Sequence, residues 1–240
     1  MLVPLTRQKF EQLIPRIATG DQYRYCSGKS PDFLRRLLIS VVAVVVIIVL
    51  AILLGQGFNL FSFLLGTVAA LYWLWGPVLW ASLRNAEYRR YKYSGFFRGR
   101  VLDVFVTEEL IGKEETVSNR GDLVIVENRE SRLNLEVGDE TGFTTEIQVP
   151  LRREHNAIAP NQIVEMIVLS NKPDLSTIAR VTDVFIPSRN LWVSDYPYLQ
   201  RFMFVEVSRR IRGDADQPRR RSKRKPRPSS RKYDRLNLLN

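Results

Sequence analysis

The sequence predicts a membrane α-helical hairpin joined to a small all-β domain and a disordered basic tail. Two long uncharged apolar stretches predict the hairpin, short β-branched segments predict the β domain, and a run of arginine, lysine, proline and serine predicts the tail. The parts we expect are an N-terminal cytoplasmic segment, the hairpin, a cytoplasmic β-barrel domain and the tail, over residues 1–30, 31–93, 94–212 and 213–240.

Charge is distributed unevenly among these parts. The chain has a formal net charge of +11, but residues 37–83 hold no charged side chain. Residues 1–36 and 84–100, which flank this apolar region, carry +4 and +5, and residues 213–240 carry +7. Residues 101–212 carry −5, so the part expected to form the β domain is mildly acidic.

A short amphipathic helix is expected within residues 6–18, although Pro15 interrupts it. Its apolar residues follow the i, i+3, i+4, i+7 spacing of one helix face: Phe10, Leu13, Ile14 and Ile17. A short helix with one apolar face suits a membrane interface.

The first apolar stretch, residues 37–54, has eighteen residues of which only Ser40 is polar. A helix of that length spans ~27 Å, close to the ~30 Å hydrocarbon core of a bilayer. Ser30 and Pro31 fit a helix N-cap and a first-turn proline, so the helix should begin near Pro31. The region before it is too long for a cleaved signal peptide, and a second apolar stretch follows.

The second apolar stretch covers residues 58–83, and a turn of only three residues, 55–57, separates it from the first. This arrangement predicts a tight helical hairpin. Small residues recur at every fourth position, which favours close packing against the first helix or a partner's helix; they are Ser62, Gly66 and Ala70. Neither stretch contains Asp, Glu, Lys, Arg or His, the groups that ion and proton pathways normally need.

The second stretch ends in features of a membrane exit. Tryptophans gather near its end, Pro77 predicts a bend, and arginines follow. The predicted membrane-interface anchors are therefore Trp73, Trp75, Trp80, Arg84, Arg89 and Arg90. Because basic residues flank both outer ends of the hairpin, we expect both termini and the β domain in the cytoplasm, with the hairpin in the plasma or thylakoid membrane.

Six segments between residues 96 and 207 have the pattern of short strands: 99–106, 122–128, 132–137, 143–151, 163–170 and 179–187. The glycines and acidic residues of 138–142 predict a hairpin connection. So many short strands favour a small closed barrel of OB or SH3-like type, with a β-sandwich as the alternative. Residues 197–212 fit either a closing helix or a last strand.

The sequence offers little catalytic chemistry. His155 is the only histidine and is expected on a surface loop, and Cys26 is the only cysteine. Gly28-Lys29-Ser30 looks like the end of a phosphate-binding loop, but Tyr23 stands where that motif requires glycine. We therefore expect a non-enzymatic protein with no cofactor and no metal.

The C-terminal tail has the composition of a disordered segment. Its basic cluster is expected to contact anionic lipid, RNA or an acidic protein; it consists of Arg219, Arg220, Arg221, Lys223, Arg224, Lys225 and Arg227. Nucleic acid is expected only at this tail, because an acidic β domain repels phosphate.

Three segments carry a resemblance: MLVPLTRQKFEQLIPRIATG, LYWLWGPVLWASLRN and RGRVLDVFVTEELIGKEETV. Together they resemble an uncharacterised family of cyanobacterial two-span membrane proteins, often labelled phosphate ABC transporter permease, over residues 1–212. The resemblance implies a plasma or thylakoid membrane address. Two uncharged spans cannot enclose a substrate path alone, so the sequence departs from what the permease label demands.

These observations favour an assembly or scaffolding factor for a membrane protein complex, and the resemblance points to a photosynthetic one. The expected partners are the lipid bilayer and that complex. Two other functions fit the sequence: an accessory subunit of a membrane transporter, and a membrane tether for ribosomes or RNA through the tail.

Overall fold

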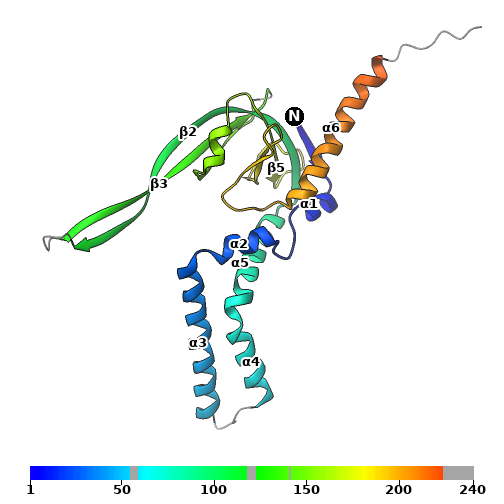
Figure 1. Cartoon of the computed structure of the whole chain (residues 1–240). Coiled ribbons are helices and arrows are strands. Elements are labelled where there is room, and N and C mark those ends of the chain that lie inside the picture. The colour runs from blue at the N-terminus through cyan, green and yellow to red at the C-terminus, as the bar shows by residue number, and fades with distance from the viewer. Residues whose placement is uncertain (55–58, 118–122, 141, 224–240) are drawn as a thin grey trace, which may run out of the picture. The chain divides into compact units, whose positions relative to one another are not determined.

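The computed structural model describes residues 1–54, 59–117, 123–140 and 142–223, and the chain divides into two units. The first unit, Met1–Arg201, contains an antiparallel sheet and five α-helices (Figure 1). The second unit begins at Phe202. It contains all of the helix α6 (Arg201–Lys223) except its first residue.

The sheet has eight strands, and every described strand pair is antiparallel. Six strands follow the order β4-β3-β2-β5-β7-β8, while β1 pairs with β2 and β6 with β5. This path runs openly from β4 to β8, with no described pair that closes it into a barrel. The strands are β1 (Leu2–Leu5), β2 (Tyr93–Val117), β3 (Leu123–Gly138), β4 (Thr144–Pro150), β5 (Ile163–Ser170), β6 (Arg180–Val181), β7 (Val184–Ile186) and β8 (Leu191–Val193).

The predicted strands are all present in some form, but several boundaries differ, and the segment predicted at 179–187 is divided into β6 and β7. The segments predicted at 122–128 and 132–137 belong to the single strand β3, and the segment at 99–106 is the middle of the much longer β2. The hairpin expected at 138–142 does connect β3 to β4, where the Asp139 amide donates to the Phe143 carbonyl (3.1 Å). Strand β1 was not predicted, because four residues that include Pro4 give no strand pattern of their own.

The core of the sheet is formed by alternating residues from neighbouring strands. Every residue of β5 after Ile163 is buried, so this strand is covered on both faces. Its side chains Val164, Met166 and Val168 belong to a cluster that also contains Phe97, Val101, Leu135, Val137, Val184 and Val193.

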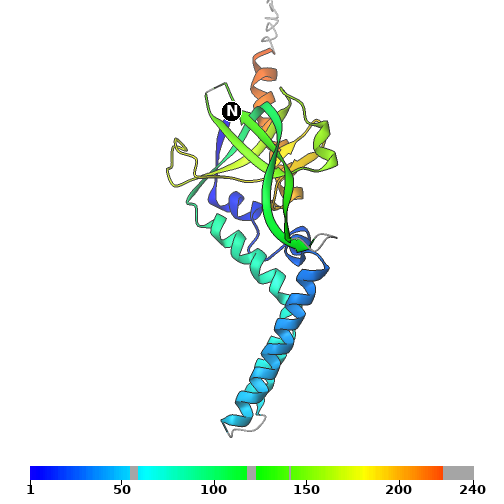
Figure 2. The same cartoon turned by 90° about the vertical axis from the view of Figure 1, so that its left-hand side faces the viewer.

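Strands β2 and β3 continue beyond the sheet as a two-stranded arm, which we define as residues 107–117 and 123–131. Strand β4 pairs with β3 only from Arg132 onward, and β5 pairs with β2 only up to Arg100. Within the described strands, the two halves of the arm therefore pair only with each other. The arm projects away from the rest of the sheet (Figures 1 and 2).

The N-terminal helix is shorter than predicted and its apolar face is buried in the protein. Helix α1 (Arg7–Leu13) ends at Ile14, which precedes Pro15 and has extended backbone, as residues before proline commonly do. Phe10, Leu13 and Ile14 are fully buried, whereas Ile17 is 73% exposed. The expected interfacial helix over residues 6–18 is therefore wrong in extent and in what its apolar face contacts.

A second short helix, α2 (Gly20–Ser27), was not predicted. Thr19 and Gln22 form its capping box: the Gln22 amide donates to Thr19 Oγ1 (3.4 Å), and Gln22 Oε1 accepts from the Thr19 amide (3.0 Å). The chain then turns at Gly28 into the next helix, which begins at Ser30.

Helix α3 (Ser30–Leu53) starts where the sequence predicts and is long and apolar enough to cross a membrane by length and composition. Pro31 lies in its first turn, and the Asp32 carboxylate accepts a hydrogen bond from the Lys29 amide (2.9 Å). Apolar side chains along the helix are exposed, among them Leu38, Val42 and Leu53. The predicted turn at 55–57 lies outside the described residues.

The second apolar stretch does not form one helix. It is broken into α4 (Leu60–Ala70) and α5 (Tyr72–Arg89), which meet at Leu71 with a bend of 71°. The described break precedes Pro77, which lies within α5. Ser40 of α3 explains the position of the break: its Oγ accepts a hydrogen bond from the Trp73 amide (3.2 Å), in the first turn of α5, where helical amides lack partners.

Helix α6 settles the choice left open for residues 197–212, because helix begins at Arg201. The helix is assigned as far as Lys223. Adding a residue to an existing helix costs much less than starting one, and Pro218 is the only proline in that extension. Residues 224–240 lie outside the described part.

His155 is buried, contrary to the expected surface loop. It belongs to the short 3-10 helix Arg153–Ala157 and is 2% exposed. Its Nδ1 accepts a hydrogen bond from the Arg152 amide (3.3 Å), and burial lowers the pKa of the imidazole.

Candidate functional site

The helices meet the sheet through a buried pair of side-chain amides, Gln22 from α2 and Asn85 from α5. Gln22 Nε2 donates to Asn85 Oδ1 (3.0 Å), and Asn85 Nδ2 donates to Gln22 Oε1 (2.9 Å). Gln22 Nε2 also donates to the Pro197 carbonyl (2.8 Å). Both side chains are fully buried, so three separate segments are fastened at one point away from water.

The segment that begins at Pro197, whose carbonyl accepts the hydrogen bond from Gln22, is also bound by Asp183. The carboxylate accepts hydrogen bonds from the amides of Tyr198 and Leu199, both at 3.0 Å. Burial raises the pKa of Asp183 to about 7, although these hydrogen bonds oppose the rise. We call Gln22, Asn85, Asp183, Tyr196 and Tyr198 the joint.

Tyrosine rings extend the joint onto α5. The Tyr198 ring stacks on Tyr88 at a centroid distance of 3.7 Å, and Tyr196 donates its hydroxyl to the Ala81 carbonyl (3.4 Å). The Arg84 guanidinium lies over the Tyr196 ring at 5.1 Å and over the Tyr25 ring at 5.5 Å. Burial raises the pKa of both Tyr196 and Tyr198, so their hydroxyls stay protonated.

Arg89 joins α5 to the N-terminal segment. Its guanidinium donates to the carbonyls of Ile14 (2.6 Å) and Glu11 (3.0 Å), and pairs with the Glu11 carboxylate (3.2 Å). The side chain is only 11% exposed. Arg89 therefore faces the interior of the protein, whereas the sequence placed it at the bilayer surface as an anchor. Arg84 is exposed, and its guanidinium contacts the Tyr196 ring of the joint and the Tyr25 ring.

The other predicted anchors remain at the surface of the helices. Trp75 donates its indole N–H to the Val68 carbonyl (2.9 Å), across the bend, and Trp80 and Arg90 are exposed. Trp73 packs edge to face against Phe33 of α3 at 5.7 Å. This contact places the start of α5 beside the start of α3.

Two of the predicted helix-packing residues, Gly66 and Ala70, face α3 across a groove of about 200 Å³. A Cβ atom added at Gly66 would meet no atom within 4 Å, so the close helix contact that the small residues favour is not made at this glycine. Ser62 instead donates both its amide and its hydroxyl to the Asn59 side chain, which caps α4.

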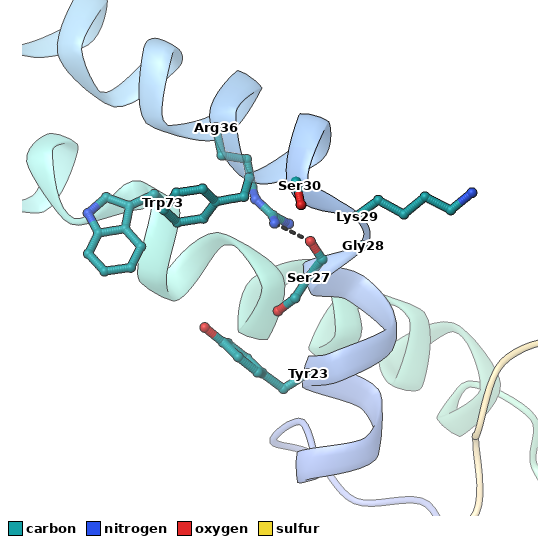
Figure 3. A pocket seen from close by; sticks show the side chains of 8 residues that line it. Tyr23, Ser27, Gly28, Lys29, Ser30, Arg36 and Trp73 are labelled. Carbon is teal, nitrogen blue, oxygen red and sulfur yellow. Dashed lines mark hydrogen bonds between the residues drawn. The ribbon is translucent and has the colours of Figure 1, made fainter.

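A cavity of about 260 Å³, lined by both polar and aromatic side chains, lies where α2 turns into α3, against the start of α5 (Figure 3). We call it the interfacial cavity. Arg36 donates to the carbonyls of Cys26 (2.7 Å) and Ser27, and Figure 3 shows the Tyr23 hydroxyl directed toward the same space while Lys29 extends away from it. The residues that line the cavity are Tyr23, Ser27, Gly28, Lys29, Ser30, Phe33, Arg36 and Trp73.

The Gly-Lys-Ser sequence lies in this cavity, but it is not the end of a nucleotide-binding loop. Helix α2 precedes it, where that motif requires a strand. Gly28 has a φ of 63°, and a side chain there would clash with the Asp32 carboxylate, so glycine is needed for the turn itself.

A comparison with protein-family models matches residues 3–218 to a family described as being of unknown function (DUF8619). The chain belongs to the DUF8619 family. The match includes the sheet, the arm, the joint and the interfacial cavity, and it ends before the basic cluster that begins at Arg219. No curated protein and no solved structure matches the chain.

The joint residues were not identified from the sequence, although one signal was present. Thr19 and Gln22 have the spacing of a capping box, which marks the start of α2, but nothing local shows that the same Gln22 reaches Asn85. In the part of the chain that the structure describes, no three His, Cys, Asp or Glu side chains gather as a metal site. What the arrangement can do is hold helices and sheet together and bind a polar group in the interfacial cavity.

Proposed function

We propose that this DUF8619 protein is a non-catalytic membrane-anchored scaffold that presents its β domain to a membrane protein complex. The observation that carries the proposal is the joint, because it fixes the sheet rigidly to the helices that enter the membrane. A buried, fully hydrogen-bonded contact determines one arrangement, whereas a simple tether would need only a flexible linker.

The anchor in this proposal is a two-span hairpin. Helix α3 supplies the first span, and its exposed apolar side chains would face lipid. Helix α4 has eleven residues, or ~16 Å, so the second span must continue into the first turns of α5. Arg35 and Arg36 at one end and Arg90 at the other would keep both ends and the β domain cytoplasmic.

The arm is the element that we assign to partner binding. Two paired strands with no further neighbours leave backbone N–H and C=O groups free at both edges, which is where an added strand can bind. Leu110, Ile111 and Ile125 are exposed on it. Its side chains with a described environment include four carboxylates and two cations, which favours a basic strand as partner: Glu108, Glu109, Glu127, Glu130, Lys113 and Arg129.

Site-specific photo-crosslinking in the full chain tests this assignment. A crosslinker at Leu110 or Ile125 should yield a discrete adduct with a membrane-complex subunit. One at Ile163, which is also exposed but lies in β5 and pairs with Arg100 outside the arm, serves as the matched control. Adducts of equal yield at all three positions, or none at the arm, would contradict the assignment.

Two other functions keep specific support. The basic cluster from Arg219 onward favours a tether to ribosomes or RNA, which predicts RNA that is released by salt and lost when residues 219–240 are deleted. The resemblance to proteins labelled as permeases favours an accessory subunit of a transporter. Recovery of a transport ATPase with the crosslinked arm would support that reading over the scaffold.

A further inference from the structure

The interfacial cavity has hydrogen-bond donors that the protein itself does not use. The Oγ of Ser27 and the Nε of Arg36 are buried and have no partner in the described structure. A buried donor without an acceptor costs about 1–3 kcal/mol, so such groups usually mark a place where something else binds. Ser27 and Arg36 both line the interfacial cavity, so a ligand there that accepts hydrogen bonds would satisfy residues that the protein leaves with unpartnered donors.

The polar groups around the cavity select the sign of that ligand. Arg36 has five N–H donors, and its contacts with the Cys26 and Ser27 carbonyls use only two. Neither Arg36 nor Lys29 forms a salt bridge with a described residue, and no carboxylate lines the cavity. Guanidinium and hydroxyl groups without an acid among them are complementary to an anion such as phosphate.

The N-terminus of α3 does not bind this anion through its helix dipole. The Asp32 carboxylate already accepts a hydrogen bond from the Lys29 amide at the N-terminus of the helix. Binding must therefore come from the side chains of Tyr23, Ser27 and Arg36. These three contribute two hydroxyls and one guanidinium, which are neutral or positively charged at neutral pH.

The position of the cavity along α3 matches the headgroup layer of a bilayer. Arg36 directly precedes the uncharged residues 37–54, and it lies about one helical turn from Ser40. Phe33 and Trp73 form an aromatic wall beside the polar groups. A phosphate held by Arg36 would thus sit at the boundary between water and hydrocarbon, and acyl chains could follow the apolar surface of α3 below it.

We propose that the interfacial cavity binds a phosphate group, supplied by the headgroup of an anionic phospholipid. The assignment rests on the proposed insertion of α3 in a membrane. The same chemistry would accept free inorganic phosphate, and the experiment has to separate these two sources.

Native mass spectrometry of the full chain, released from nanodiscs of phosphatidylcholine and phosphatidylglycerol, measures the bound lipid directly. The wild-type chain should retain one phosphatidylglycerol. Ser27→Ala and Tyr23→Phe each remove one hydroxyl without adding volume, and each should weaken retention about tenfold, since a hydrogen bond to a charged group is lost.

The neighbouring arginines give a matched pair of variants. Arg36→Gln should abolish retention, whereas Arg35→Gln removes the same charge from an exposed side chain that does not line the cavity, and should leave retention unchanged. Because Arg36 also holds two carbonyls, thermal melting must first show that Arg36→Gln folds. If it does not, the two hydroxyl variants decide.

Each outcome separates the possibilities. Retention that inorganic phosphate displaces at equal concentration would assign the cavity to free phosphate rather than lipid. Equal retention in wild type, Ser27→Ala and Arg35→Gln, or none in wild type, would overturn the inference while the scaffold proposal stands. Extraction of the chain from membranes by alkaline carbonate would instead contradict the membrane insertion on which the scaffold proposal depends.

Discussion

Gln22 and Asn85, 63 residues apart in sequence, exchange two side-chain hydrogen bonds of 3.0 and 2.9 Å in a fully buried pair. Each amide presents both a donor and an acceptor, so the pair satisfies itself only in one relative position of α2 and α5. The contact therefore determines where α5 meets the sheet.

The two amides should be energetically coupled, so that the loss of stability on removing both is smaller than the sum of the losses on removing each alone. Asn85→Leu leaves the Gln22 amide partly unpaired in the interior, and we expect a loss of about 1–3 kcal/mol in unfolding free energy. The double variant Gln22→Leu/Asn85→Leu should lose less than the sum of the single variants. Thermal or denaturant unfolding in detergent measures this cycle, and additive losses would show that the two amides are not coupled.

Asp183 should make the stability of the β domain depend on pH. Its pKa rises from an ordinary value near 4 to about 7 in the fold, so the folded state binds the proton more tightly. The stability that this pKa difference contributes is fully present below about pH 4, and it is lost as the pH rises to about 7. Melting temperatures measured across this range should decrease with pH in wild type and change less in Asp183→Asn.

The Asp183→Asn variant is needed as a reference because His155 also makes stability depend on pH. Burial lowers the pKa of its imidazole, which makes stability fall as the pH drops through its titration and so acts in the opposite direction. Both proteins contain His155, and the difference between their curves isolates Asp183. An identical pH slope in wild type and Asp183→Asn would contradict the assigned role.

Adjacent arginines at the end of α5 should behave differently. Arg89→Gln removes hydrogen bonds to Ile14 and Glu11 from a mostly buried site, and we expect a loss of about 2 kcal/mol in stability. Arg90→Gln alters an exposed side chain and should change stability by less than about 0.5 kcal/mol. Equal effects of the two variants on the melting temperature would show that Arg89 acts as a surface charge.

Ser40 should control the break between α4 and α5. Ser40→Ala deletes the acceptor of the Trp73 amide, at a cost of about 0.5–2 kcal/mol, as for a lost helix cap. With that acceptor gone, the helix gains by closing the bend at Leu71. Spin labels at Leu64 and Leu83, one on each helix, should report a longer separation in the variant, and an unchanged distance would assign the bend to another cause.

The contrast between α3 and α4–α5 shows which features the sequence could predict. The start of α3 follows from local signals, namely Pro31 and the uncharged residues after it, and it was predicted correctly, although the N-cap is Lys29 and not the expected Ser30. The break at Leu71 depends on Ser40, which lies 33 residues before Trp73. Pro77, the local signal for a bend, lies six residues after this break, so the break itself could not be predicted from the sequence.

The joint was missed for the same reason. Asp183 accepts hydrogen bonds from the amides of residues 15 and 16 positions later in the sequence. Arg89 donates to the carbonyl of Ile14, which lies 75 positions earlier. In the sequence, Arg89 is one of several basic residues after an apolar stretch, and that context predicts a membrane anchor. Only the folded chain shows that its guanidinium is enclosed by backbone carbonyls.

The topology of the hairpin tests the central claim most directly. Single cysteines at Leu60, at the start of α4, and at Glu154, in the β domain, can be placed in a Cys26→Ser background and treated with a membrane-impermeant maleimide in intact spheroplasts. A two-span anchor with a cytoplasmic β domain predicts labelling at position 60 in intact cells and at position 154 only after lysis. Labelling at position 154 in intact cells would contradict the account.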